Sequence, residues 1–97
     1  MRHRFVDEAL AEFIKDGRYY NRKVPGLGDA FVDEVEAGIE VILNGPEVWR
    51  VVEDDVRRYL VNRFPYGIYY TIEGEVVVIW AVKNLHRDPD YWKQRRK

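Results

Sequence analysis

The chain has 97 residues, 46% of them hydrophobic and 34% charged, which predicts one globular domain with a single core over residues 1–97. The absence of cysteine excludes disulfides, thiolate nucleophiles and cysteine zinc sites, and two histidines argue against a histidine-rich metal centre. We therefore expect no metal and no cofactor. No run approaches the ~20 apolar residues that a membrane-spanning helix needs. Asp7 and Glu8 interrupt the N-terminal segment before a signal peptide could form, so we expect a cytoplasmic protein with no membrane partner.

The formal charge of −1 is unevenly distributed along the chain. Residues 1–55 carry 7 Lys or Arg and 13 Asp or Glu, whereas residues 56–97 carry 9 and 4. A basic second half is typical of a surface that binds an acidic partner or a phosphate backbone. The other interpretation is that Asp and Glu simply solvate the helix surfaces of the first half.

The first elements are a short segment and a helix. Residues 2–6 form either a short strand or a frayed lead-in, because only Phe5 and Val6 are apolar. Asp7 is positioned to cap a helix that reaches Tyr20 or Arg22. Its apolar spacing predicts an inner and an outer face. The expected inner residues are Ala9, Leu10, Phe13 and Ile14, and the expected outer ones are Glu8, Glu12, Lys15 and Asp16.

A second helix follows the connector at residues 24–28, where Pro25, Gly26 and Gly28 interrupt regular secondary structure. Asp29 is positioned to cap it. Apolar residues recur every four positions from Leu27 to Leu43, which is the clearest helical pattern in the sequence. The helix ends at residues 44–46. Two helices joined by so short a turn predict an antiparallel helical hairpin.

After residue 46 the apolar period changes from 3.6 to 2. Strands are expected over residues 56–64 and 67–72, with a hairpin turn at residues 73–74. Residues 76–82 are apolar at every position, which predicts a central strand buried on both faces. Residues 87–97 form a basic tail, either a short helix or irregular. The predicted fold class is therefore α+β, a helical hairpin packed on one face of an antiparallel sheet of three to four strands.

Several segments together resemble a known family. They are Tyr19-Tyr20, Gly26-Leu27-Gly28 leading into Phe31, Pro46, Arg57-Arg58-Tyr59, Arg63-Phe64-Pro65-Tyr66 and Arg87-Asp88-Pro89-Asp90-Tyr91-Trp92. In this order they resemble the RelE/ParE superfamily of type II toxin–antitoxin toxins, also called plasmid stabilisation proteins. The resemblance implies a small α+β toxin that a cognate antitoxin neutralises by wrapping it. RelE-like members cleave mRNA on the ribosome, whereas ParE-like members inhibit DNA gyrase.

A nuclease would need a base, an acid and a cation near the scissile phosphate. The candidates are Lys83, His86, Arg87 and Tyr91, all at the end of the predicted central strand. The alternative is that the cations lie on the surface and that Tyr91 and Trp92 pack the tail onto the sheet. Two departures from RelE-like enzymes favour a ParE-like protein. The arginine expected near Tyr66 is absent, and Asn84 stands where relatives often carry histidine.

If the protein acts by binding, we expect the basic residues at the sheet edge and in the tail to contact the target. Arginine beside tyrosine suits the recognition of phosphate or carboxylate groups. The predicted target-binding residues are Arg57, Arg63, Lys83, Arg87, Trp92, Arg95 and Arg96. The alternative is that the strand arginines pair with carboxylates of the chain itself, among them Glu53, Asp54, Asp55 and Glu73.

The sequence therefore predicts a toxin that binds a cellular target such as DNA gyrase. The alternative is a ribosome-dependent, metal-independent mRNA endoribonuclease, and a third is a chain that has lost toxicity but still binds its antitoxin. In each case the expected partner is a cognate antitoxin whose amphipathic segment docks beside the helical hairpin.

Overall fold

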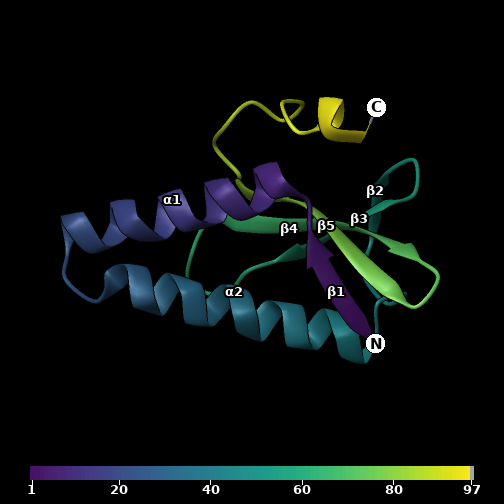
Figure 1. Ribbon diagram of the computed structural model, residues 1–97, viewed down its shortest axis with the longest axis horizontal. Coiled ribbons are helices and arrows are strands. Elements are labelled where there is room, and N and C mark those ends of the chain that lie inside the picture. Colours follow the sequence, from purple (N-terminus) through teal and green to yellow (C-terminus); the bar gives the residue numbers. More distant parts are fainter. Residues whose placement is uncertain (97) are drawn as a thin grey trace.

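Two long helices form one layer of the structure, and a sheet forms the other (Figure 1). The helices are α1 (Asp7–Lys23) and α2 (Leu27–Asn44), and they run side by side in opposite directions. This computed structural model describes residues 1–96, so Lys97, the last residue of the predicted basic tail, lies outside the description. The antiparallel helical hairpin is confirmed.

The helix starts differ from the prediction in detail. Helix α1 begins at Asp7 after Val6, so Asp7 lies in the first turn, where the helix dipole favours a carboxylate, and does not cap the helix. Helix α2 begins two residues before Asp29. Its first amides are capped by Asn21, whose Oδ1 accepts from the backbone N–H of Gly28 at 2.7 Å and of Asp29 at 3.3 Å. A side chain of α1 therefore fixes the start of α2.

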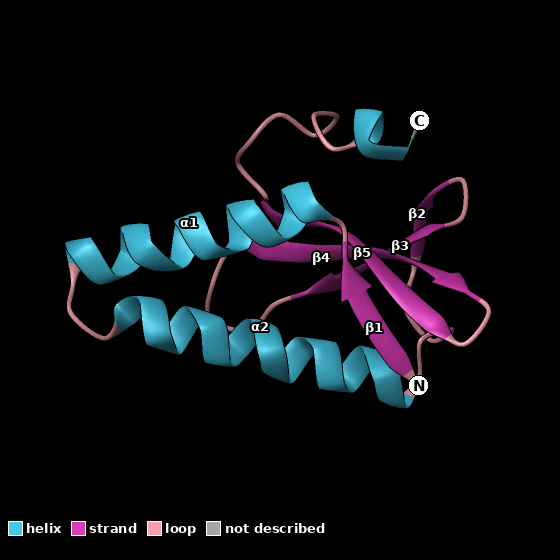
Figure 2. Cartoon of the chain, in the orientation of Figure 1, coloured by secondary structure: helices cyan, strands magenta, loops and turns pink. Residues whose placement is uncertain are grey.

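The sheet has five strands in the order β1-β5-β4-β3-β2 (Figure 2). Their bounds are Arg2–Phe5 for β1, Val51–Glu53 for β2, Val56–Leu60 for β3, Tyr66–Glu73 for β4 and Val76–Asn84 for β5. The α+β class and the meander are confirmed, but the strand number and the purely antiparallel sheet need correction. Strand β1 pairs parallel to β5 and makes the sheet mixed. This pairing uses backbone groups, such as the Val6 N–H donating to the Ile79 carbonyl, and so needs few apolar side chains.

Strand β3 is shorter than predicted. It ends at Leu60, not at Phe64, because the chain turns at residues 61–65, where Arg63 adopts a φ of 70°. This left-handed conformation cannot continue a strand.

Strand β5 lies between β1 and β4 and is buried on both faces, which confirms the prediction of a central strand. Its helix-facing residues join one hydrophobic cluster that includes Phe31, Val35 and Ile39 of α2. On the opposite face, Ala81 packs with Tyr69 and Trp92 in a second cluster. The register shifts between Tyr69 and Tyr70, so Ala81 faces the tail although Ile79 faces the helices. The C-terminal tail, which ends in a 3₁₀ helix at Lys93–Arg96, thus forms the second cover of the sheet.

The orientation of α1 corrects a second prediction. Ala9 and Phe13 are buried as expected, but Leu10 and Ile14 are 41% and 44% exposed. Glu12, expected to point outward, has a side chain that is only 11% exposed. The helix is rotated in this way because it contacts both the sheet and the tail.

We predict that Gly28→Ala and Gly17→Ala have opposite effects on the free energy of unfolding. A Cβ on Gly28 would lie 2.0 Å from the Gly17 carbonyl oxygen and 2.6 Å from Asn21 Cγ, and we expect overpacking to cost about 1–3 kcal/mol. A Cβ on Gly17 would meet Val32 at 3.4 Å, an ordinary contact, so alanine in this helix interior should stabilise by about 0.5–1 kcal/mol. Urea unfolding followed by circular dichroism measures both, and equal effects would contradict the close helix contact.

Candidate functional site

An open cleft of about 440 Å³ lies where β4 begins and β5 ends, at the paired residues Tyr66 and Asn84. Residues of α1 and of the tail line it as well. The lining residues are Asp16, Tyr19, Tyr20, Tyr66, Asn84, His86, Arg87 and Tyr91. Four tyrosines make its walls aromatic, and three of the four predicted nuclease residues lie at this cleft.

A hydrogen bond between a carboxyl group and a tyrosine, both with raised pKa values, joins α1 to β4 in the cleft. The Tyr66 hydroxyl donates to Asp16 Oδ2 at 2.9 Å. Burial raises the pKa of Asp16 above its usual value of 3.8, although the bond from Tyr66 opposes this effect. Burial also raises the pKa of Tyr66 above its ordinary value. The tyrosine therefore keeps its proton at neutral pH and serves as a fixed hydrogen-bond donor.

Arg87 and Tyr91 form the wall that the tail contributes. The Arg87 guanidinium lies over the Tyr91 ring, 3.7 Å from its centroid, and 3.5 Å from Glu12 Oε2. The Tyr91 hydroxyl donates to the same carboxylate at 2.9 Å. Burial raises the pKa of Tyr91, so this tyrosine is also neutral at physiological pH. Arg87 keeps 55% of its side chain exposed and presents one cation to the cleft.

Glu12 holds these groups in place. Its carboxylate accepts a paired interaction from Arg95, with Nη1 at 2.8 Å and Nη2 at 3.1 Å, and the Arg95 side chain is only 13% exposed. Arg95 also donates to the Trp80 carbonyl at 2.9 Å. The backbone N–H of Val82 donates to Glu12 Oε1 at 3.3 Å. One carboxylate on α1 therefore ties together β5, the tail and the cleft wall.

The other predicted target-binding residues do not converge on the cleft. Arg57 donates to the carbonyls of Glu47 and Trp49 at 2.9 and 2.7 Å, not to the carboxylates proposed as its partners. Arg63 is 64% exposed and lies 3.7 Å from Glu34. These two arginines therefore occupy different settings, one structural and one on the surface.

The predicted tail residues are engaged within the chain. Arg96 pairs with Asp55 at 2.5 Å, a carboxylate that the alternative interpretation had assigned to the strand arginines. Trp92 is 2% exposed and packs on Tyr69 with ring centroids 5.4 Å apart, which confirms that the tail packs onto the sheet. A role for Trp92 in target binding stays a prediction, and it would have to act by supporting the tail, because its ring is covered. Lys83 is 3% exposed and faces the tail side of the sheet.

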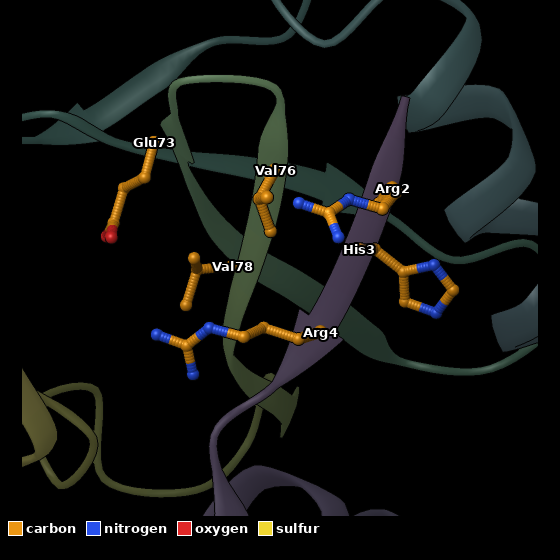
Figure 3. Close-up of a pocket in the computed structure, with 6 residues that line it drawn as sticks. All are labelled: Arg2, His3, Arg4, Glu73, Val76 and Val78. Atoms are coloured by element: carbon orange, nitrogen blue, oxygen red, sulfur yellow. The ribbon is translucent and has the colours of Figure 1, made fainter.

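A second hollow of about 380 Å³ lies along β1 at the hairpin end of β5 (Figure 3). Arg2 and Arg4 reach over Val76 and Val78 there, on the same side as Glu73, while His3 points away. None of the predicted site residues lines it. The cleft at the other end of the strands is therefore the candidate site.

Sequence reasoning missed the contribution of α1. Glu12 and Asp16 were assigned to the solvated face, although they carry the hydrogen bonds of the site. Their spacing of four residues on one helix gave no sign of the partners, which lie 50 to 83 positions later in the chain. Tyr19 and Tyr20 enter the sequence interpretation through the family resemblance and the end of the first helix, not as site residues.

The comparisons with known proteins agree with this architecture. The profile described as ParE toxin of type II toxin-antitoxin system, parDE, matches residues 4–91. The chain belongs to the ParE toxin family. A solved chain of the chromosomal ParDE TA system from P. aeruginosa superposes on this ParE toxin with a TM-score of 0.76 at 14% identity, covering 89% of this chain and 97% of that one. At that identity the likeness shows the fold alone. A comparison with curated proteins gives no match.

The family assignment confirms the predicted resemblance and its ParE-like leaning, and it makes the chain the toxin component of a type II system. Within residues 1–96, no group of three or more His, Asp or Glu side chains is placed to hold a metal ion. In the same described part of the ParE toxin, no helix has the length and apolar content needed to cross a membrane.

We predict that Asp16→Asn gains stability relative to the wild type as the pH rises. Because the folded chain raises the pKa of Asp16, the carboxyl group stabilises the fold most below its usual value of 3.8, and this contribution is lost as the pH rises through the raised pKa. The amide still accepts from Tyr66 but cannot ionise. Urea unfolding between pH 3.5 and 7 should show similar stabilities at the acid end and a more stable variant at neutral pH. Asp33→Asn, an exposed change on α2, is the control, and a pH-independent difference for Asp16→Asn would contradict the assignment.

Glu12→Ala should lower the free energy of unfolding by about 3 kcal/mol, because it leaves the largely buried Arg95 guanidinium without a carboxylate partner. The tail should also detach from the sheet. Hydrogen exchange at residues 91–96 measures this, and the exposed change Glu8→Ala on the same helix is the matched control. A tail that stays protected in Glu12→Ala would show that Glu12 does not hold it.

Proposed function

We propose that this ParE toxin inhibits growth in the cytoplasm by binding a cellular target such as DNA gyrase, with no chemistry of its own. The chemical character of the residues that line the cleft supports this proposal most. Its aromatic walls and single exposed guanidinium offer a binding surface, while the buried Tyr66 and the partly buried Tyr91, whose pKa values are both raised, hold their protons well above neutral pH.

Proton transfer at neutral pH would need groups that exchange a proton there. Tyr66 and Tyr91 are fixed donors, and Asn84 has no exchangeable proton of this kind, so His86 is the one imidazole among the described residues at the cleft that proton transfer could use. Arg87 is already held by Glu12 and by the ring of Tyr91. A cleft built in this way favours recognition over catalysis.

The exposed members of the predicted target-binding set are the ones we assign to direct contact. Arg87 lies at the cleft and Arg63 at the turn before β4, with 55% and 64% of their side chains exposed. Arg57, Arg95 and Arg96 are engaged inside the chain, and we assign them to holding the surface in shape.

The cognate antitoxin is the second partner that we propose. Leu10 and Ile14 lie one helical turn apart on α1 and are 41% and 44% exposed. They give the helical hairpin an outward apolar strip on which the amphipathic segment of an antitoxin could dock.

The alternative function, mRNA cleavage on the ribosome, has one observation in its favour. The cleft gathers His86, Arg87 and Tyr91, three of the four residues that a nuclease was expected to use. Lys83, the fourth, does not line the cleft. In this alternative His86 would carry the proton and Arg87 would stabilise the phosphorane.

Purified protein should inhibit DNA supercoiling by gyrase and leave mRNA intact in a translation extract. We expect Arg87→Ala to weaken the inhibition at least about tenfold, because it removes a charged contact at the cleft. His86→Ala should retain it. Supercoiling assays on agarose gels and primer extension on the translated mRNA measure the two activities.

The product of the adjacent antitoxin gene, added in equimolar amount, is the control and should restore supercoiling. If mRNA were instead cut on the ribosome, and the cutting disappeared in both His86→Ala and Arg87→Ala, the nuclease would replace the binding function.

A further inference from the structure

Three neighbouring strands place an uncommon set of residues on the tail side of the sheet. Leu60 of β3, Gly67 of β4 and Lys83 of β5 are direct cross-strand partners and form one row. Arg58 lies two residues before Leu60 on the same face. Gly67 has no side chain, and a Cβ there would lie 3.2 Å from both Cγ and Cδ of Arg58. The Arg58 stem therefore crosses the Gly67 position, beside Lys83.

Lys83 is the buried member of this set, at 3% exposure. Its ammonium group donates to the Asn84 carbonyl at 3.1 Å. Within residues 1–96, no carboxylate lies in ion-pair range of Lys83 or Arg58. Burial lowers the pKa of Lys83, and the positive charges of Arg58 and Arg87 lower it further, while Asp88 alone opposes them.

Two adjacent cations without a carboxylate partner are costly, because a buried charge is stable only when it is paired and hydrogen-bonded. Other cations of this chain found internal partners, as Arg95 did with Glu12. An external oxyanion bound by the partly exposed Arg58 guanidinium would supply the missing charge beside the buried Lys83, and the guanidinium fork suits a carboxylate or phosphate oxygen pair.

The surroundings distinguish a carboxylate from a nucleic-acid phosphate. Leu60 of β3 and Leu85, which directly follows the end of β5 at Asn84, are 52% and 38% exposed. A phosphate backbone gains nothing from such aliphatic neighbours, whereas a peptide with an acidic side chain between apolar ones would cover them.

We propose that Arg58, Lys83 and the two flanking leucines form a docking site for a protein segment that carries an aspartate or glutamate between aliphatic side chains. The proposal deepens the proposed function, because it gives the chemistry of a partner segment for a toxin that acts by binding. The site is a surface separate from the tyrosine-lined cleft, since none of its four residues lines that cleft.

The test uses the full chain and a capped peptide of sequence Leu-Asp-Leu-Glu-Leu, with Leu-Asn-Leu-Gln-Leu as its uncharged match. NMR titration should shift the Gly67 and Leu60 amides and the Arg58 Nε signal with the acidic peptide, and much less with the uncharged one. Arg58→Gln and Lys83→Met should each weaken binding at least about tenfold. Lys83→Met removes a buried unpaired charge, so it should fold as well as the wild type, and Arg18→Gln on the exposed side of α1 should bind normally.

Inorganic phosphate and an RNA octamer are titrated in parallel. If the octamer shifted the same signals and the acidic peptide did not, the site would be a nucleic-acid contact and the proposal would be wrong. Equal binding of both peptides, or unchanged binding in Arg58→Gln and Lys83→Met, would overturn it as well. Selective binding of the acidic peptide by a protein that leaves gyrase active would support the docking site and contradict only the gyrase function.

Discussion

The carboxylate of Glu12 is the interaction on which the second half of the structure depends. It lies on α1, yet its partners are the backbone of β5 and the Arg95 and Tyr91 side chains of the tail. A buried ion pair offsets its desolvation only when the lone pairs and donors are used, and here each oxygen accepts two or more groups. The Glu12–Arg95 pair therefore also determines the path of the tail, because it fixes where the tail crosses from β5 to α1.

That crossing explains why the chain can bury β5 on both faces with only one helical layer. The hairpin covers one side through α2, and Trp92 of the tail covers Tyr69 and Ala81 on the other. The cleft is the space left at the strand ends between these two covers. Its polar groups, Asp16 and Arg87, come one from each cover, so the shape of the cleft depends on the Glu12 contacts that join them.

Local sequence patterns predicted the elements whose buried surface follows from their own run of apolar residues. The four-residue repeat of α2 and the continuous apolar run of β5 each report a buried surface directly. The errors concern long-range partners. Strand β1 joins the sheet through its backbone, and Glu12 turns inward to meet Arg95, which lies 83 positions later, so neither carries a periodic signal. The same reason explains why the cleft was only partly predicted: its tail residues were named, and its helix residues were not.

The structure changes the interpretation of the charge asymmetry in the sequence. A basic second half and an acidic first half suggested an external acidic partner, but much of that charge is neutralised inside the chain by pairs such as Lys93 with Glu53 and Arg96 with Asp55. Net charge per segment therefore overstates the surface available for binding. Within residues 1–96, Lys83 is a buried cation with no carboxylate in ion-pair range, and Arg58 beside it has none either. In the proposed docking site, recognition would depend on these two cations and their apolar neighbours, and not on the net charge of the second half of the chain.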